Sequence, residues 1–261
     1  MANLYIIKIG GNIIDNDEKL SSFLNSFAQL PGLKILVHGG GKLATKLATD
    51  LNIPQQLVDG RRITDAETLK IVTMVYAGLV NKTITARLQQ LNCNAVGITG
   101  ADANLIEAHK RTGHQIDYGF AGDIDVIHTE FLQVLLKQQY VPVIAPITHD
   151  RKGQLLNTNA DTIAQEIAKS MSSFYDTHLV YSFEKSGVLK DVEDEASLIK
   201  KITPDEYVQL KGKNIISGGM IPKLDNAFAA LKKGVKSVTI GKAEKLKELI
   251  QGSTGTTIIN E

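Results

Sequence analysis

An apolar run near the N-terminus ends in a pair of glycines and carries a lysine inside it: residues 4–11 read LYIIKIGG. The run is short, rich in isoleucine and bounded by glycine, which predicts a buried β-strand over Leu4–Ile9. An ammonium group in a buried strand costs free energy unless a negative charge lies close to it. Lys8 therefore predicts a negatively charged partner elsewhere in the chain or on a ligand.

A second apolar run ends in the same way, because residues 34–42 read KILVHGGGK. Strands that end in glycine before a helix leave backbone N–H groups that can hold phosphate or carboxylate oxygens. The loops after two adjacent parallel strands meet at the carboxyl edge of the sheet, where open α/β folds bind ligands. A tight turn explains either cluster alone, but the two together favour an anion-binding edge.

The composition excludes several classes of protein. Of 261 residues, 43% are hydrophobic and 22% charged, which is usual for a globular chain of one large domain or two lobes. The net charge of +1 gives no general attraction to nucleic acids or anionic membranes. One cysteine, Cys93, excludes a disulfide framework and a thiolate metal site. Without a signal peptide or an apolar run of ~18 residues, the sequence predicts a soluble cytoplasmic protein.

Short β-rich runs alternate with longer amphipathic stretches, which predicts an α/β fold with a mostly parallel sheet. The predicted strands are Leu4–Ile9, Lys34–Val37, Ala95–Ile98, Val141–Ala145, Leu179–Phe183 and Ser237–Ile240. The predicted helices are Glu18–Gln29, Lys42–Leu51, Asp65–Leu91, Thr129–Gln138, Asp161–Ser170, Thr203–Leu210, Met220–Lys233 and Ala243–Ile250. Glu107–Asp125 is expected to form hairpins over the sheet, Lys190–Leu198 an exposed acidic excursion, and Ser170–Asp176 a boundary between lobes.

Residues 156–161 read LNTNAD and precede a predicted helix. One side chain is enough to cap the first turn of a helix, so Asn157 is free to bind a ligand and Asp161 to position a cation. Residues 60–65 read GRRITD, where two arginines form either a surface pair or a fork that grips a carboxylate. Residues 217–223 read SGGMIPK, and the glycine pair before this helix favours contact of Lys223 with an anion over a solvated lysine.

Known motifs separate the alternatives. The Gly-Lys pairs are not followed by Ser or Thr, so no Walker-type loop is present, and no serine has the glycine spacing of a nucleophile elbow. The histidines lack metal-ligand spacing. The segment Gly39–Ala44 matches the dinucleotide fingerprint, with Asp59 as the acidic residue. A nicotinamide-dependent oxidoreductase therefore stays an alternative, although it leaves Lys8 without a role.

Together these features predict a cleft made of glycine amides, two lysines, an aspartate and an arginine. Phosphoryl transfer requires little else, because its catalysis consists mainly of positioning and neutralising negative charge. A carboxylate acceptor is already ionised at neutral pH and needs no general base. The sequence therefore favours a kinase over a hydrolase or a metalloenzyme.

Five motifs carry a resemblance to a known family. KIGG, VHGGG, GRRIT, NTNAD and GGMIPK, in this order along the chain, resemble those of the amino acid kinase family. The resemblance implies a three-layer αβα sandwich with a mostly parallel central sheet and two lobes. It also implies transfer of the γ-phosphoryl group of ATP to the γ-carboxylate of an N-acyl-L-glutamate in arginine biosynthesis. The implied acyl group is acetyl, with succinyl as the alternative.

The resemblance also implies a role for each site residue. Lys8 and Lys223 stabilise the transferring phosphoryl group, and Asp161 orients them. The substrate contacts Gly40, Gly41, Arg62 and Asn157, and the nucleotide side is made by Gly10, Gly11, Asn159, Gly218 and Gly219. Magnesium is expected to be held by nucleotide oxygens and water, with no protein metal site.

The implied lobes are residues 1–172, which bind the acyl-glutamate and form a homodimer, and residues 173–261, which bind ATP. The segment Leu179–Leu189 departs from the family pattern because it lacks an aspartate, for which Glu184 is a substitute. This departure leaves a non-catalytic anion sensor as a further alternative. Because Lys8 lies close to the N-terminus, the helix typical of arginine-inhibited members is not expected, and the dimer is predicted to be insensitive to arginine.

Overall fold

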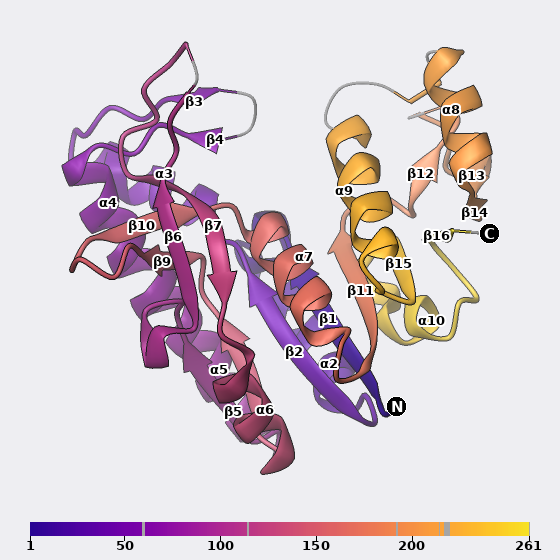
Figure 1. Cartoon of the computed structure of the whole chain (residues 1–261), viewed down its shortest axis with the longest axis horizontal. Coiled ribbons are helices and arrows are strands. Elements are labelled where there is room, and N and C mark those ends of the chain that lie inside the picture. The colour runs from indigo at the N-terminus through magenta and orange to yellow at the C-terminus, as the bar shows by residue number, and fades with distance from the viewer. Residues whose placement is uncertain (59–60, 114, 192, 214, 217–219, 261) are drawn as a thin grey trace.

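The computed structural model describes residues 1–58, 61–113, 115–191, 193–213, 215–216 and 220–260. Its central sheet has eight strands (Figure 1). In spatial order they are β14 (Lys201–Ile202), β16 (Thr256–Ile258), β15 (Ser237–Lys242), β11 (Asp176–Phe183), β1 (Asn3–Ile9), β2 (Leu33–His38), β8 (Val141–Ile144) and β5 (Ala95–Ile98). In the described residues all neighbours are parallel except β15 and β16. The mostly parallel sheet and the six predicted strands are thus confirmed.

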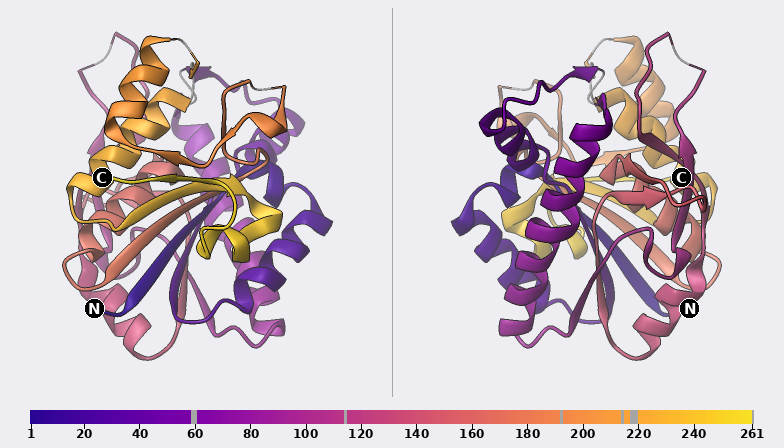
Figure 2. Two further views of the ribbon diagram at one scale, coloured as in Figure 1. Left: turned by 90° about the vertical axis from the view of Figure 1, so that its right-hand side faces the viewer. Right: turned by 90° about the vertical axis from the view of Figure 1, so that its left-hand side faces the viewer.

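Helices cover both faces of this sheet (Figure 2). One face carries α6 (Thr129–Lys137), α7 (Ala160–Met171), α8 (Pro204–Gly212) and α9 (Met220–Lys232). The other carries α1 (Gly11–Ile14), α2 (Asp17–Ala28), α3 (Gly41–Asp50), α4 (Ala66–Val72), η1 (Thr73–Val80), α5 (Asn81–Gln90) and α10 (Leu246–Ile250). This arrangement is the predicted three-layer αβα sandwich, and every predicted helix has a counterpart in it.

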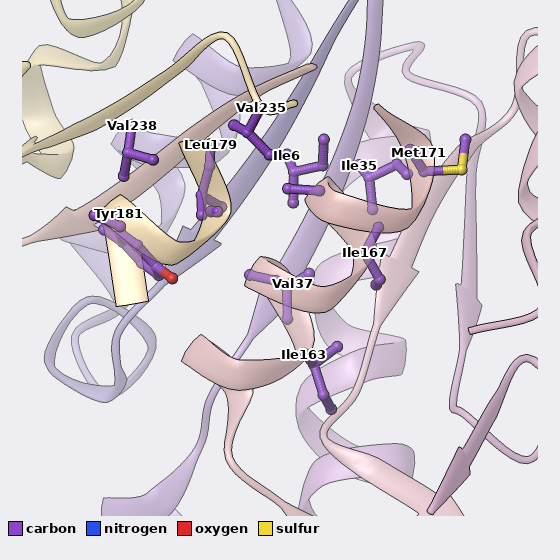
Figure 3. Packing of buried hydrophobic residues seen from close by; sticks show 14 of the residues in the cluster. Ile6, Ile35, Val37, Ile163, Ile167, Met171, Leu179, Tyr181, Val235 and Val238 are labelled. Atoms are coloured by element: carbon purple, nitrogen blue, oxygen red, sulfur yellow. The ribbon is translucent and has the colours of Figure 1, made fainter. Parts of the chain in front are cut away.

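The alternation of side chains along β1 determines where Lys8 points. Leu4 and Ile6 belong to the core beneath α7, whereas Ile7 and Ile9 belong to the core on the opposite face. Figure 3 shows Ile6 in one cluster of buried side chains with Ile167 and Met171 of α7. Burying one such side chain contributes ~1.5–3 kcal/mol, so this orientation is strongly held. Because side chains two residues apart share a face, Lys8 points to the α7 side.

The predicted hairpin over the sheet is also present. It consists of β6 (Ile106–Lys110) and β7 (Ala121–Ile127), which are antiparallel. Together with β9 (Ile147–His149) and β10 (Leu155–Thr158), they form a small second sheet in which each strand pairs with two others. This sheet places the start of α7, which follows β10 directly, beside the end of β1.

The predicted helix over Asp65–Leu91 is right in extent but differs in type at its centre. The chain runs as α4, then as the π-helix η1, then as α5, without a break. Apolar periodicity indicates a helix but does not resolve hydrogen bonds to the fifth residue from those to the fourth. Elsewhere the predicted start of α8 is confirmed, since Thr203 and Glu206 form a capping box.

The remaining elements are short. They are β3 (Leu57–Val58), β4 (Arg61–Arg62), β12 (Val188–Leu189), β13 (Leu198–Ile199), η2 (Asp102–Asn104), η3 (Glu195–Ser197) and η4 (Ala243–Lys245). The hairpin β3–β4 matters for the site, because it carries both arginines of the GRRIT motif. The predicted acidic excursion corresponds to the segment between β12 and β13, which is largely exposed where the structure describes it.

Candidate active site

The two glycine clusters lie against each other at the carboxyl edge of the sheet. Gly10 is the N-cap of α1 and Gly40 the N-cap of α3. The amide of Gly39 donates to the carbonyl of Ile9 over 3.2 Å. A side chain on Gly39 would place its Cβ 3.8 Å from the amide nitrogen of Gly11. The two loops are thus in direct contact, and their helix N-termini make this edge favourable for anions.

The negative charge demanded by the buried lysine is Asp161. Lys8 Nζ lies 2.7 Å from Asp161 Oδ1, and Lys223 Nζ lies 3.8 Å from Asp161 Oδ2. The exposed fractions of the side chains are 15% for Lys8, 29% for Lys223 and 21% for Asp161. One carboxylate therefore holds two largely buried ammonium groups from β1 and α9, which are far apart in the sequence.

The pKa values follow from this arrangement. Burial alone would raise the pKa of Asp161, but the charges of Lys8 and Lys223 outweigh it and hold that pKa below its usual value. For Lys223, burial lowers the pKa, Asp161 opposes this shift, and the charge of Lys8 adds to it. The site thus holds two cations against one anion, so a further negative charge is attracted to it.

Two aromatic residues of β11 contact the group formed by Lys8, Asp161 and Lys223. The hydroxyl of Tyr181 donates to the backbone carbonyl of Asp161 over 3.3 Å. Its pKa is raised well above the usual value by burial and by the charges of Asp161 and Glu166, so it stays protonated. The ring of Phe183 has its centroid 5.1 Å from Lys223 Nζ, a cation–π distance. The stretch that departs from the family pattern therefore contacts the second lysine directly.

A cavity of about 190 Å³ opens beside Lys8 and Asp161. It is lined by Lys8, Gly39, Gly40, Gly41, Leu57, Arg61, Arg62, Tyr76, Ala121, Gly122, Pro146, Asn157, Thr158, Asn159, Ala160 and Asp161. Every residue to which a substrate contact was assigned in the sequence is among them. Arg61, which received no role from the sequence, lines it as well, and burial followed by the charge of Arg111 lowers its pKa.

Arg62 is anchored before any ligand binds. Its Nη2 donates to the carbonyl of Gly41 over 2.9 Å and to Thr45 Oγ1 over 2.8 Å, and its Nη1 donates to Gln55. Arginine carries five N–H donors, so some remain for a carboxylate. The side chain is buried, at 8% exposed. These contacts hold the guanidinium against the N-terminus of α3, which is a pre-organised place for an anion.

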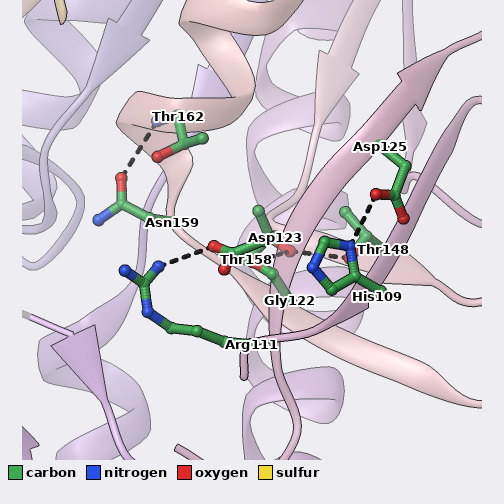
Figure 4. Close-up of polar contacts among 9 residues, drawn as sticks. All are labelled: His109, Arg111, Gly122, Asp123, Asp125, Thr148, Thr158, Asn159 and Thr162. Atoms are coloured by element: carbon green, nitrogen blue, oxygen red, sulfur yellow. Dashed lines mark hydrogen bonds and ion pairs between the residues drawn. The ribbon is translucent and has the colours of Figure 1, made fainter. Parts of the chain in front are cut away.

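The two asparagines of the LNTNAD segment have different tasks. Asn159 is the N-cap of α7, since its Oδ1 accepts from the amides of Asp161 and Thr162, as Figure 4 shows for Thr162. Asn157 is not needed for capping, and its Nδ2 donates to Thr64 Oγ1 over 3.0 Å at the cavity wall. This division agrees with the expectation that one capping residue suffices. The predicted nucleotide contact of Asn159 stays a prediction.

A second cavity, of about 360 Å³, adjoins the first through Gly41, Leu57 and Arg62. Its lining includes Gly10, Gly11, Asn12, Ile13, Lys42, Thr45, Phe183 and Glu184. The residues predicted for the nucleotide side thus divide, with Gly10 and Gly11 in this cavity and Asn159 in the first. Gly218 and Gly219, and also Asp59 of the dinucleotide alternative, lie outside the described residues.

Sequence reasoning missed several residues that shape the site. Tyr76 packs against Gly40, and Tyr181 contacts Asp161. His38 hydrogen-bonds Gly39 in the glycine loop (Gly39–Gly41), and Asn81 hydrogen-bonds His38. Of these, His38 carried a local signal because it directly precedes the glycines of HGGG, and Tyr181 lies in the stretch that departs from the family pattern. The others reach the site through contacts between distant segments, which no local pattern records.

Comparison with known proteins agrees with the resemblance that the motifs carry. Residues 3–242 match the model of the Amino acid kinase family. The chain belongs to the amino acid kinase family. It is 56% identical to the acetylglutamate kinase of Cytophaga hutchinsonii, with 99% of each chain covered, and 52% identical to that of Phocaeicola vulgatus, with 98% of each covered. The resemblance predicted from the five motifs is confirmed.

A solved structure has a similar fold. The carbamate kinase of Giardia lamblia bound to AMP-PNP superposes with a TM-score of 0.70 at 14% identity, covering 99% of this chain and 98% of that chain. Within the described ranges, no cluster of three or more His, Cys, Asp or Glu side chains is arranged to hold a metal ion. Nor does that part of the chain contain a helix long and apolar enough to cross a membrane.

Proposed function

We propose that this chain transfers the γ-phosphoryl group of ATP to the γ-carboxylate of N-acetyl-L-glutamate, giving N-acetyl-L-glutamyl 5-phosphate in arginine biosynthesis. The observation that carries the proposal is the Lys8–Asp161–Lys223 group beside a cavity lined by Arg62 and Asn157. The relatives that match the chain at 52–56% identity over nearly its whole length are acetylglutamate kinases, which supports this activity. A cytoplasmic location is proposed with it, since the reaction consumes ATP.

In the proposed mechanism an oxygen of the γ-carboxylate attacks the γ-phosphorus of ATP. The bond from that phosphorus to the bridging oxygen breaks, and ADP leaves with the electron pair. No proton has to be removed, because the acceptor is already a carboxylate. Lys8 and Lys223 neutralise the charge that spreads over the phosphoryl oxygens, and Asp161 keeps both ammonium groups at the same place.

The remaining residues position the two substrates. Arg62 is proposed to hold the α-carboxylate of N-acetyl-L-glutamate, and Asn157 its acetamido group, with Gly40 and Gly41 offering backbone amides. Gly10, Gly11, Asn159, Gly218 and Gly219 are proposed for the phosphates of the nucleotide. Mg²⁺ is proposed to enter bound to ATP oxygens and water.

A coupled ADP-release assay tests the proposal. With ATP, Mg²⁺ and N-acetyl-L-glutamate the chain is expected to turn over, and N-succinyl-L-glutamate is expected to give a lower kcat/KM. The comparisons support neither N-succinyl-L-glutamate as acceptor nor a nicotinamide-dependent oxidoreductase. NADH is therefore expected not to bind in a fluorescence titration. Absence of ADP release with N-acetyl-L-glutamate, together with no binding of an ATP analogue by calorimetry, would instead favour a sensor that has lost its ATP site.

We further propose that residues 1–172 form the acyl-glutamate-binding and dimerisation lobe and residues 173–261 the ATP-binding lobe of a homodimer. Large exposed apolar side chains support this division. In residues 1–172, apart from Met1, they are Leu51, Leu57, Met74, Leu79, Ile116, Val126, Val134 and Tyr140, against Phe174 and Val208 in the rest of the described chain. Met74 and Leu79 lie five residues apart on η1, so in a π-helix they face the same way.

Sedimentation velocity tests the homodimer. The unmodified chain is expected to sediment as a dimer, and the double variant Met74→Ser, Leu79→Ser as a monomer, because both changes remove apolar area from one face. Val208→Ser makes a similar change on α8 and serves as the control that should stay dimeric. A monomeric unmodified chain, or a dimer that survives the double change, would contradict the proposal.

A further inference from the structure

His38 is buried and contacts the glycine loop, residues Gly39–Gly41. His38 ends β2, and its side chain is 0% exposed. Its Nδ1 lies 2.7 Å from the carbonyl oxygen of Gly39, and its Nε2 lies 3.1 Å from Nδ2 of Asn81. Gly39 and Gly40 line the first cavity, whereas His38 itself does not. The reaction steps proposed above leave this histidine without a task.

The partners of His38 determine which of its nitrogens carries the proton. A carbonyl oxygen only accepts hydrogen bonds, so Nδ1 must donate to Gly39. Asn81 Nδ2 also donates to the carbonyl of Val143 over 2.9 Å. If the side-chain amide of Asn81 were rotated by 180°, its Oδ1 would lie against the carbonyl oxygen of Val143, and two acceptors would face each other. Nδ2 of Asn81 therefore faces both Val143 and His38, and Nε2 of His38 must accept a hydrogen bond from it. Burial lowers the pKa of His38 to about 4, so this neutral form is the one present at neutral pH.

The π-helix explains how its own residues reach the loop together. A side chain on Gly40 would place its Cβ 3.0 Å from Tyr76 Cδ1 and 3.4 Å from Val80 Cγ2. Asn81 follows at once and bonds His38. The widened turn of a π-helix, with bonds to the fifth residue, brings positions such as Tyr76, Val80 and Asn81 onto one side. The end of η1 therefore packs against Gly40, and the first residue of α5 hydrogen-bonds His38, which precedes the loop.

The bond to Gly39 also sets the direction of the next amide. In a trans peptide the carbonyl of Gly39 and the N–H of Gly40 point in opposite directions, and no cis bond occurs in the described chain. With the carbonyl turned to His38, the N–H of Gly40 is turned away from His38. We propose that His38 is a positioning residue that fixes the Gly39–Gly40 peptide so that the amide of Gly40 faces the oxygen atoms of the substrate. This inference rests on the proposed kinase function.

Two substitutions separate the two bonds of His38. In His38→Asn the side-chain amide nitrogen stands where Nδ1 stood, so it can still donate to Gly39 but does not reach Asn81. In His38→Gln the terminal group stands where Nε2 stood, so it reaches Asn81 but leaves the Gly39 carbonyl without its donor. Each variant loses the imidazole ring and one of its two buried hydrogen bonds. Each is therefore the control for the other.

The kinetic test compares these variants by ADP release. His38→Asn is expected to keep kcat/KM for N-acetyl-L-glutamate within about threefold of the unmodified chain. His38→Gln is expected to lose on the order of 10- to 100-fold, as for a misdirected oxyanion donor, with the KM for ATP unchanged. The melting temperatures of the two variants should be similar. If activity instead follows the melting temperature in both variants, or if His38→Gln is as active as His38→Asn, the proposal is wrong.

A spectroscopic measurement tests the same inference without the variants or the substrate. In ¹⁵N-labelled unmodified protein, the two ring nitrogens of His38 are expected to show the neutral form with the proton on Nδ1 from pH 6 to 8. A proton on Nε2, or an imidazolium in that range, would overturn the proposal. Lack of kinase activity in the unmodified chain would count against the proposed function, whereas a wrong tautomer counts against His38 alone.

Discussion

Replacing Lys8 by alanine is expected to lower kcat for N-acetyl-L-glutamate by on the order of 100- to 1,000-fold, while the chain still folds. The ammonium group lies 2.7 Å from Asp161 and lines the first cavity, where the phosphoryl group is proposed to pass. Its loss removes a preorganised positive charge that interacts more strongly with the transition state than with the substrates. Lys223 still pairs with Asp161 in the variant, so no unpaired buried carboxylate results.

The measurement is steady-state ADP release at saturating ATP, with circular dichroism to verify folding. Lys8→Met keeps most of the side-chain volume, so an equal loss in both variants assigns the effect to charge and not to a cavity. Lys46→Ala, at an exposed position of α3, is the matched control and should keep full activity. Lys223→Ala is expected to behave like Lys8→Ala. Activity retained in either variant of the pair would contradict the proposed mechanism.

The strands and the lysine could be predicted because their signals are local. A run such as Leu4–Ile9, bounded by glycines, has few structures open to it other than a buried strand. The cost of a charge inside that strand then demanded a partner, and Asp161 is that partner. In the same way, the capping residues of α8 act within four positions, so their effect is visible in the sequence.

Other parts of the site depend on contacts between distant segments and could not be predicted. Asn81 lies 43 residues from His38, and their hydrogen bond exists only because η1 places Asn81 beneath the loop. The contacts of Arg62 with Gly41 and Thr45 likewise join β4 to α3. Hydrophobic periodicity also does not reveal the antiparallel pairing of β16 with β15, since that depends on the return path of the chain.

The second large effect is expected from Asp161→Asn. This change leaves two largely buried ammonium groups without their shared counter-charge, so Lys8 and Lys223 repel each other and separate. We expect kcat to fall on the order of 100- to 1,000-fold. Stability is expected to fall by about 2 kcal/mol, less than for a fully buried ion pair because Asp161 is 21% exposed. Glu166→Gln, on the same helix and paired with Lys169, is the control for a carboxylate-to-amide change.

The pH dependence of the two losses separates the charge effect from general damage to the fold. Burial already lowers the pKa of Lys223, and without Asp161 that pKa falls further below its unfolded value of 10.5. Between the two values the unfolded chain binds more protons than the folded chain, so the stability of the variant rises with pH. The stability gap to the unmodified chain, measured by urea unfolding, is therefore expected to narrow as the pH rises above neutral.

Activity is expected to change in the opposite direction. A neutral lysine no longer stabilises the phosphoryl oxygens, so the residual kcat of Asp161→Asn should fall over the same pH range in which its stability recovers. Local disorder around α7 would instead make activity and stability recover together. The two curves, measured on one preparation from pH 7 to 9.5, thus decide whether Asp161 acts by holding the ammonium group of Lys223 in its charged form beside the reacting phosphate.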